Sequence, residues 1–465
     1  MEPIKFEDVQ GFVFSGYNKV MKYSSYYLLK IHDTDKVRLW LKTLTDEQRI
    51  TTGKHRGTTW CLNLAFSFQG FKKLGVIKDS NEPFEQAFRD GMYSPRRSVI
   101  LDDQGDSHPD RWEWGNTNES IDILLLLFSR DEATHEERKN IELTSFAGGG
   151  LLLIKRLDAV PPVNMGKFTK EHFGFADGIS NLDLMVEGFP KTPVTRISTN
   201  PQALQTIPAG EFLLGYPNGY DGKLTAIPGA GSLGNEFGIN GTYLVFRQLQ
   251  QDVKGFWSFI DKEANAQGIN REYLAAKFVG RWKNGAVVSP DETSAPNVIS
   301  NNFDFSDDPN GIGCPFGSHI RRTNPRGIGL GETIGDSLKV ANRHRLLRRG
   351  RSYGTFLDNP LDDGDNKNRG LFFICLNANI ERQFEFVQRT WINGIKFNGL
   401  YDEDEPITGS YGLNQPNFIR SFTLQDKLLR QRVCNFPRFV NLKGGGYFFL
   451  PGIKALRMLA SDGVA

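Results

Sequence analysis

A single histidine, His319, lies in a turn-rich segment from Gly313 to Arg326 that reads GCPFGSHIRRTNPR. The segment contains no second histidine and no carboxylate, whereas a protein zinc site needs several nitrogen or sulfur ligands at short spacing. Haem needs only one axial ligand from the chain, because the porphyrin supplies four nitrogens. An isolated histidine is more often an ordinary hydrogen-bonding residue than a ligand, so this segment alone leaves both interpretations open.

Two further stretches carry residues that could do chemistry. GFADG (residues 174–178) stands within HFGFADGIS, and LLRRGRSYG covers residues 346–354. Together with CPFGSHIRRTNPR, these motifs resemble, in order along the chain, those of the dye-decolourising peroxidases, haem peroxidases unrelated to the plant type. Weaker matches at residues 8–17 (DVQGFVFSGY) and 439–452 (FVNLKGGGYFFLPG) extend the resemblance over nearly the whole chain. The long loops and full C-terminal half are similar to the larger class of the family.

The resemblance implies an enzyme that reduces hydrogen peroxide and oxidises aromatic donors such as dyes and phenols. It assigns proton transfer to Asp177 and stabilisation of the departing oxygen to the permanently cationic Arg348. Because a carboxylate is an effective base mainly at acidic pH, we expect an acid optimum for dye oxidation. Some relatives carry an asparagine two positions after this arginine. Here that position is Gly350, so we expect an Asp–Arg pair without a third polar group.

The implied cofactor is haem b, one per chain, with His319 as the axial ligand of the iron. Gly178 fits a turn that brings the backbone close to a flat cofactor, although Asp-Gly is also a common turn pair. Arg326 is expected to pair with a haem propionate. Arg321 and Arg322 compete for that role or lie at the surface.

The second ring nitrogen of an axial histidine should donate to a partner that fixes its tautomer. We expect this partner for His319 at Asn379 or Glu381, which open a predicted helix. Electrons from bulky dyes could pass through aromatic residues. The candidate relays are Trp282, Tyr353 and Trp391.

Aromatic and branched residues run together where strands are predicted. The predicted strands are residues 25–31, 59–68, 121–128, 146–156, 241–247 and 370–376. Apolar residues at helical spacing, with Asp33 and Asp252 as N-caps of two of the segments, predict helices. The predicted helical segments are residues 34–44, 132–143, 253–260 and 380–391. Residues 80–115 are predicted to form a long loop, and residues 191–210, rich in Pro, Thr, Ser and Asn, to join two domains.

Alternating strands and helices suit a sheet covered by helices. The resemblance implies an α+β fold of two ferredoxin-like domains, residues 1–195 and 196–465, each an antiparallel sheet covered by helices. The haem is expected in a cavity of the second domain. The main alternative is a haem-binding or haem-handling protein with little turnover.

Bulk properties limit the other function classes. Fifty-six basic residues against 54 acidic ones give a net charge of +2, which argues against general nucleic-acid binding. Four scattered cysteines fit a reducing compartment, and the apolar run at residues 123–128 is too short to span a membrane. With no signal peptide visible, we expect a cytoplasmic protein without a membrane partner. The sequence specifies no oligomeric state.

Overall fold

The computed structural model describes residues 4–77, 84–116, 120–182, 207–220, 228, 234, 236–290, 292–327, 329–361, 368–411, 415, 417–426 and 429–461. A nine-stranded antiparallel sheet forms its centre, in the order β10-β11-β8-β14-β2-β3-β1-β4, with β9 also paired to β11. Its strands are β1 (Tyr23–Ile31), β2 (Trp60–Phe66), β3 (Ile123–Ser129), β4 (Leu151–Ala159), β8 (Thr242–Gln251), β9 (Leu347–Arg348), β10 (Arg351–Tyr353), β11 (Gly370–Asn377) and β14 (Val440–Leu450).

The two ends of this strand order approach each other. Just after β4, the backbone N–H of Val160 donates to the carbonyl oxygen of Ser352 in β10 at 3.0 Å. Two small antiparallel sheets complete the strands. They are β5 (Val163–Met165), β6 (Phe168–Lys170) and β7 (Ala176–Asp177), and β12 (Ser421–Leu424) with β13 (Gln431–Cys434).

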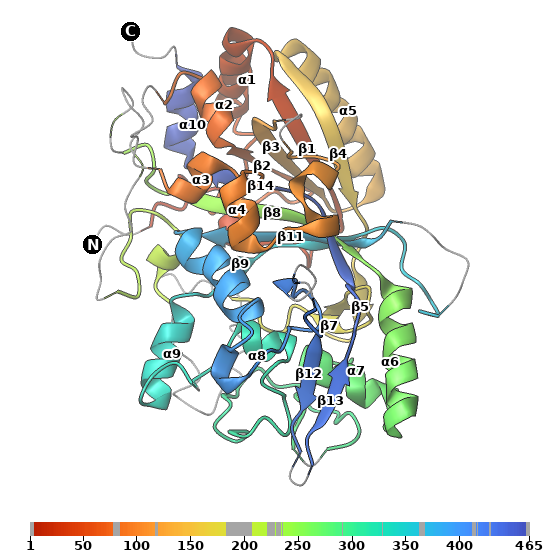
Figure 1. Ribbon diagram of the computed structural model, residues 1–465. Coiled ribbons are helices and arrows are strands. Elements are labelled where there is room, and N and C mark those ends of the chain that lie inside the picture. The colour runs from red at the N-terminus through yellow and green to blue at the C-terminus, as the bar shows by residue number, and fades with distance from the viewer. Residues whose placement is uncertain are drawn as a thin grey trace.

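Helices cover the sheet, as the alternation of elements predicts (Figure 1). They are α1 (Thr34–Asp46), α2 (Phe68–Lys73), α3 (Gln86–Asp90), α4 (Pro95–Leu101), α5 (Glu132–Gly148), α6 (Val253–Gln267), α7 (Arg271–Val279), α8 (His319–Thr323), α9 (Ile334–Asn342) and α10 (Ile453–Ala460). Both predicted N-caps are confirmed: Asp33 accepts from the N–H of Lys36, and Asp252 from that of Gly255. Strand β3 is buried throughout, as its continuous apolar run predicts.

Three local predictions were wrong. The stretch predicted as a long loop contains α3 and α4, and α4 starts at a signal that we missed: Ser94 caps the N–H of Arg97 and Pro95 takes the first turn. The strand predicted from Phe146 begins only at Leu151, because α5 continues through Gly148. The apolar stripe at residues 380–391 is buried, but residues 381–385 and 387–392 are π-helical rather than α-helical.

The architecture is α+β, with antiparallel sheets covered by helices in two ferredoxin-like halves, as predicted. The halves are closely joined, because β14 pairs with both β8 and β2, and the C-terminal helix α10 packs on α1 (Figure 1). The predicted boundary between residues 195 and 196 lies outside the described residues.

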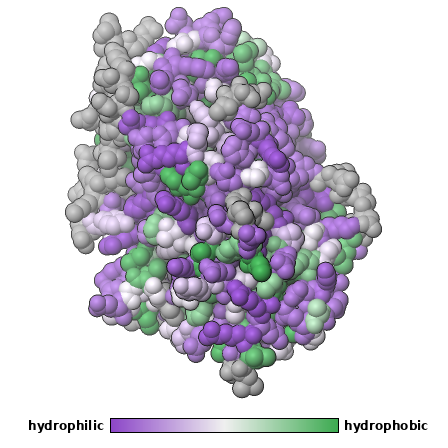
Figure 2. Space-filling view, in the orientation of Figure 1, coloured by the Kyte–Doolittle hydropathy of each residue, from purple (hydrophilic) through white to green (hydrophobic). Residues whose placement is uncertain are grey.

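Hydrophilic residues predominate on the face shown in Figure 2, and hydrophobic ones form small separate groups. In the part of the chain that the model describes, no helix combines the length and the apolar character needed to cross a membrane.

Candidate active site

His319 is the first residue of the short helix α8. Ser318, which precedes it, anchors the helix start by donating from its hydroxyl to the carbonyl oxygen of Lys277 at 2.5 Å. The Nδ1 atom of His319 lies 3.2 Å from Oε1 of Glu405, and the histidine side chain is 30% exposed. Among the described residues, Nε2 has no hydrogen-bond partner. The imidazole is therefore oriented through one nitrogen, while the other remains open.

Glu405 is completely buried and receives hydrogen bonds on both carboxylate oxygens. Besides His319, its donors are the backbone N–H groups of Ile407, Thr408 and Gly409, at 2.6–2.9 Å, and the Thr408 hydroxyl. Burial by itself disfavours the charged carboxylate, but the charge and hydrogen bond of His319 and the amides of Ile407 and Thr408 outweigh it. The pKa of Glu405 falls to about 2. The histidine therefore faces a permanent anion.

The prediction of Asn379 or Glu381 as the histidine's partner was wrong. Asn379 accepts from the backbone N–H of Arg382, and Glu381 forms an ion pair with Arg97 at 2.6 Å. The true partner, Glu405, comes from a loop 86 residues downstream of His319. The signal in the sequence is the run of four acidic residues at 402–405, of which the last three are buried.

Arg321 and Arg322 hold loops together, which corrects the prediction that they meet a propionate or lie at the surface. Both are essentially buried. Arg322 donates to the carbonyl oxygens of Trp391, Ile392, Gly394 and Glu403 at 2.8–3.2 Å. It therefore ties α8 both to the π-helical segment and to the loop that carries Glu405.

Arg321 holds the loop that precedes α8. It donates to the carboxylate of Asp308 at 3.1 Å and to the carbonyl of Cys314 at 2.7 Å, and it lies between the rings of Phe305 and Phe316. Burial raises the pKa of the Cys314 thiol to about 11, against the opposing charge of Arg321, so this cysteine is a buried structural residue.

Asp177 and Arg348 come together from segments 171 residues apart. Asp177 ends β7, whereas Arg348 ends β9, where it lies opposite Cys375 of β11. Arg348 Nη1 lies 3.5 Å from Asp177 Oδ1, and the two side chains are 39% and 38% exposed. Oδ1 also accepts from the N–H of Gly178 at 2.7 Å, and Gly178 has a φ of +89°, which favours glycine. Among the described residues, no partner is found for Oδ2 of the carboxylate.

Arg348 has a second polar partner, which corrects the expectation of an isolated pair. Its Nη2 donates to Oδ1 of Asn181 at 3.1 Å. Asn181 lies four residues after Asp177 in the same turn, whereas our prediction considered only position 350.

Arg326 links the histidine segment to the turn that follows GFADG. Its Nη2 donates to Ser180 Oγ at 3.3 Å and to Asn301 Oδ1 at 2.5 Å, and its Nη1 donates to the carbonyls of Asn301 and Phe303. Arg345 donates to the carbonyl of the same Ser180 at 3.4 Å. Arg326 and Arg345 thus connect the segments that follow His319 and precede Arg348 to the turn that follows Asp177.

A Ser–His–Asp grouping in the N-terminal half, formed by Ser25, His135 and Asp158, has hydrogen-bond directions that differ from those of a catalytic triad. Ser25 donates to Asp158 at 2.5 Å, and the ring of His135 contacts Ser25 and Ser129 at 2.9 and 3.1 Å. Because the serine proton is already given to the carboxylate, the histidine cannot serve as its base. Burial lowers the pKa of His135 to about 4, so the ring is neutral.

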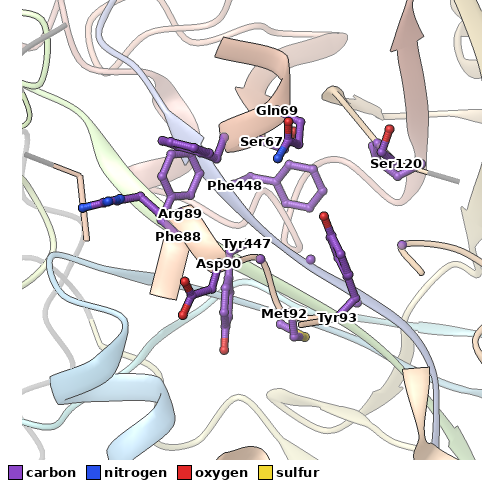
Figure 3. Close-up of a pocket in the computed structure, with 16 residues that line it drawn as sticks. Ser67, Gln69, Phe88, Arg89, Asp90, Met92, Tyr93, Ser120, Tyr447 and Phe448 are labelled. Carbon is purple, nitrogen blue, oxygen red and sulfur yellow. The ribbon is translucent and has the colours of Figure 1, made fainter. Parts of the chain in front are cut away.

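The proposed electron relays are all buried: Trp282 and Trp391 are 3% exposed and Tyr353 is 5% exposed. The pocket in Figure 3 lies elsewhere, between the glycine-rich stretch of β14 and residues 88–93. Five aromatic residues contribute to its lining, Tyr93 points toward Phe448, and none of the predicted site residues reaches it.

Comparison with known proteins places this geometry in a family. Residues 8–149 match the model of the DyP dimeric alpha+beta barrel domain. The dye-decolorizing peroxidase msp1 of Mycetinis scorodonius is 31% identical, over 98% of this chain and 87% of the relative. The multifunctional dye peroxidase DyP2 of an Amycolatopsis species is 27% identical, over 86% of this chain and 82% of the relative.

Solved structures share the fold over the full length. A DyP-type peroxidase from an Anabaena species superposes with a TM-score of 0.79 at 25% identity, covering 98% of this chain and 94% of that one. A dye-decolorizing peroxidase in complex with 2,6-dimethoxyphenol gives a TM-score of 0.77 at 26% identity, covering 98% and 100%. The motifs, the fold and the full-length similarity agree: the chain belongs to the family of dye-decolourising peroxidases.

Proposed function

We propose that the protein is a haem b-dependent peroxidase, with one haem per chain, that reduces hydrogen peroxide and oxidises aromatic donors such as dyes and phenols. His319 would hold the haem iron through its ring nitrogen on the proximal side, which we define by His319, Glu405 and Arg322. Asp177, Arg348 and Asn181 form the distal side, where peroxide reacts. The observation that carries the proposal is the His319 ring, whose Nδ1 is bound to a buried carboxylate while Nε2 has no partner in the described part of the chain.

The donor set fits a haem iron. A neutral imidazole that donates from Nδ1 keeps its lone pair on Nε2, the atom that binds a metal. Glu405 accepts from Nδ1 and also from three backbone N–H groups, so it fixes this tautomer and the orientation of the ring, as is typical of partners of metal-binding histidines. When bound, haem supplies the redox-active iron and an extended ring that exchanges electrons with the donors.

On the distal side the chain handles protons and charge. Asp177 would accept a proton from one oxygen of the peroxide and return it to the other oxygen, which would leave as water. Arg348 stabilises the negative charge that develops on the departing oxygen. Both side chains are more than a third exposed, so a small peroxide molecule can reach them.

The remaining polar residues suit the carboxylates of the cofactor. Arg326, with its like-charged neighbours Arg281 and Arg345, lies in a region where burial lowers the pKa of its guanidinium group. We propose Arg326 and Arg345 as the partners of the propionates, and Gly178 as the point where the backbone approaches the ring. With the proposed division of the chain after residue 195, haem is held largely by the second domain.

Reconstitution with haemin tests the assignment. The wild-type protein and His319→Ala are titrated with haemin, and the absorption spectrum and the peroxide-dependent oxidation of 2,6-dimethoxyphenol are recorded. We expect a stoichiometric Soret band and turnover for the wild type, and a weakened or shifted band without turnover for the variant. An unchanged spectrum in His319→Ala would contradict the ligand assignment. Haem binding without peroxide turnover in the wild type would favour the haem-handling alternative.

A further inference from the structure

The guanidinium group of Arg348 is held by two oxygen atoms that belong to one turn. Its Nη1 faces Asp177 Oδ1 at 3.5 Å, and its Nη2 faces Asn181 Oδ1 at 3.1 Å. The amide contact is the shorter of the two. Because arginine has only donors, the amide group must present its oxygen to Arg348. We propose that Asn181 is a positioning residue of the distal side, which fixes the orientation of Arg348; this inference rests on the function proposed above.

The backbone turn at Gly178 places the Asn181 side chain beside Arg348. Gly178 has a φ of +89°, and the N–H of Asn181 donates to the carbonyl of Gly178 at 3.4 Å, which closes the turn. The Asn181 side chain folds back over Gly178, where its Nδ2 would lie 3.5 Å from an added Cβ atom. A single short segment therefore carries both the proton-transfer carboxylate and the acceptor for Arg348.

Position 350, where some relatives carry a third polar residue, cannot hold a side chain in this fold. Gly350, two residues after Arg348, has no room for a side chain, because a Cβ atom there would lie 2.5 Å from the carbonyl oxygen of Phe372 in β11. The strand pairing that places Arg348 opposite Cys375 brings β11 this close. The polar group must therefore come from the opposite segment, and Asn181 supplies it.

An amide suits this task better than a second carboxylate would. It accepts the hydrogen bond of Nη2 without neutralising the positive charge of Arg348, which the departing oxygen needs. It also does not compete with Asp177 for the proton, since an amide does not titrate. Arg348 has a cationic neighbour in Arg345, so without the amide it would be free to turn away from that charge.

Fluoride provides a probe of this orientation that is independent of turnover. It binds to ferric haem as an anion and accepts hydrogen bonds from a cation beside it. We would measure its dissociation constant from the absorption spectrum, and the rate constant for the reaction with peroxide by stopped flow. The proteins are the haem-loaded wild type, Asn181→Leu, Asn181→Asp, Arg348→Leu and the double variant Asn181→Leu/Arg348→Leu. Asn265→Leu, at an exposed position on α6, is the matched control.

We expect Arg348→Leu to weaken fluoride binding and slow the peroxide reaction about 100-fold or more, and Asn181→Leu about 10-fold. Asn181→Asp keeps an oxygen acceptor but adds a negative charge beside Arg348, so its rate should lie between those of Asn181→Leu and the wild type. In the double variant, removal of the amide should add nothing, because Asn181 acts only through Arg348.

The outcomes separate the two proposals. If Arg348→Leu changes both quantities but Asn181→Leu changes neither, the inference about Asn181 is overturned and the proposed function stands. The inference is also overturned if the effect of Asn181→Leu persists in full in the Arg348→Leu background, since that would mark a merely structural role. If Arg348→Leu itself leaves fluoride binding and the peroxide rate unchanged, the distal assignment fails.

Discussion

The proximal and distal sides of the site are built in opposite ways. On the proximal side, Glu405 is completely buried with donors on both oxygens, and Arg322 is buried against four carbonyl groups. On the distal side, the ion pair of Asp177 and Arg348 spans 3.5 Å and is more than a third exposed. A ligand has to be held in one orientation, whereas groups that exchange protons with a small substrate have to remain accessible. The comparison predicts that distal substitutions change rates while proximal ones change stability and cofactor affinity.

The largest effect is expected from Asp177→Asn. Loss of the proton acceptor should lower the rate constant of the haem-loaded protein with peroxide by about 10²–10⁴-fold. Because the side chain is exposed, the free energy of unfolding in urea should stay within about 0.5 kcal/mol of the wild type. Asp307→Asn, also exposed, serves as the control and should change neither quantity. A large loss of stability in Asp177→Asn would contradict the expectation that distal substitutions change rates without changing stability.

Arg322→Met should strongly lower the stability of the proximal side. The substitution leaves four carbonyl groups without their donor and removes a buried cation whose charge acts on the acidic residues 403–405. We expect the haem-free protein to lose about 3–5 kcal/mol in urea unfolding. Arg96→Met, on the exposed face of α4, should lie within about 0.5 kcal/mol of the wild type. Equal stabilities for the two variants would show that the buried arginine contributes nothing.

Glu405→Gln tests the hydrogen-bond partner of His319, the proposed ligand. An amide brings an NH₂ group against donors that need an acceptor, so the orientation of His319 should loosen. We expect the affinity for haemin to fall about 10–100-fold, measured by competition with an apo-protein of known affinity. The exposed Glu332→Gln should bind haemin like the wild type. Unchanged affinity in Glu405→Gln would show that the buried carboxylate does not contribute to ligand binding.

The smallest expected effect is the pH dependence of stability that His172, in the segment before Asp177, contributes. His172 is buried, it donates to the carbonyl of Tyr353 at 2.8 Å, and burial lowers its pKa to about 4. As the pH falls, His172 binds a proton in the unfolded chain before it does so in the folded protein. The contribution of the neutral, buried ring to the free energy of unfolding is therefore complete above pH 6.5 and disappears as the pH falls towards 4. Between pH 8 and pH 5 the wild type should lose about 1–2 kcal/mol from this group.

His172→Gln should lack that part of the pH dependence, as measured by urea unfolding of the haem-free protein at several pH values. His55→Gln, at an exposed position, should retain it. Identical pH profiles for wild type and His172→Gln would mean that the buried ring is not the group that titrates.

Residues inside motifs could be assigned from the sequence, and residues outside them could not. His319, Asp177 and Arg348 each stand in a recognisable motif, and the fold brings their segments together as expected. Glu405 lies in an irregular loop, where neither periodicity nor spacing connects it to a histidine 86 residues earlier. Asn181 was missed because only position 350 was considered, and the steric closure of that position depends on strand pairing.

The same limit applies to the fold. Side-chain caps such as Asp33 are local, and they were predicted correctly together with the strands and apolar faces near them. The apolar spacing at residues 380–391 fits an α-helix as well as the observed π-helical backbone, in which the N–H of Glu385 donates to the carbonyl of Ile380. The division of the chain after residue 195 stays a prediction.

The way in which the two halves join has a consequence for synthesis. Strand β14 and helix α10 are the last described elements of the chain, yet β14 meets β2, and α10 packs on α1. A ribosome delivers the N-terminal half first, with the edge of β2 unpaired and one face of α1 uncovered. Both stay so until the C-terminal end has emerged, so the nascent chain cannot complete its central sheet during translation. A truncated translation product would keep the unpaired edge of β2 and the uncovered face of α1 exposed. Such chains are expected to aggregate or to bind chaperones.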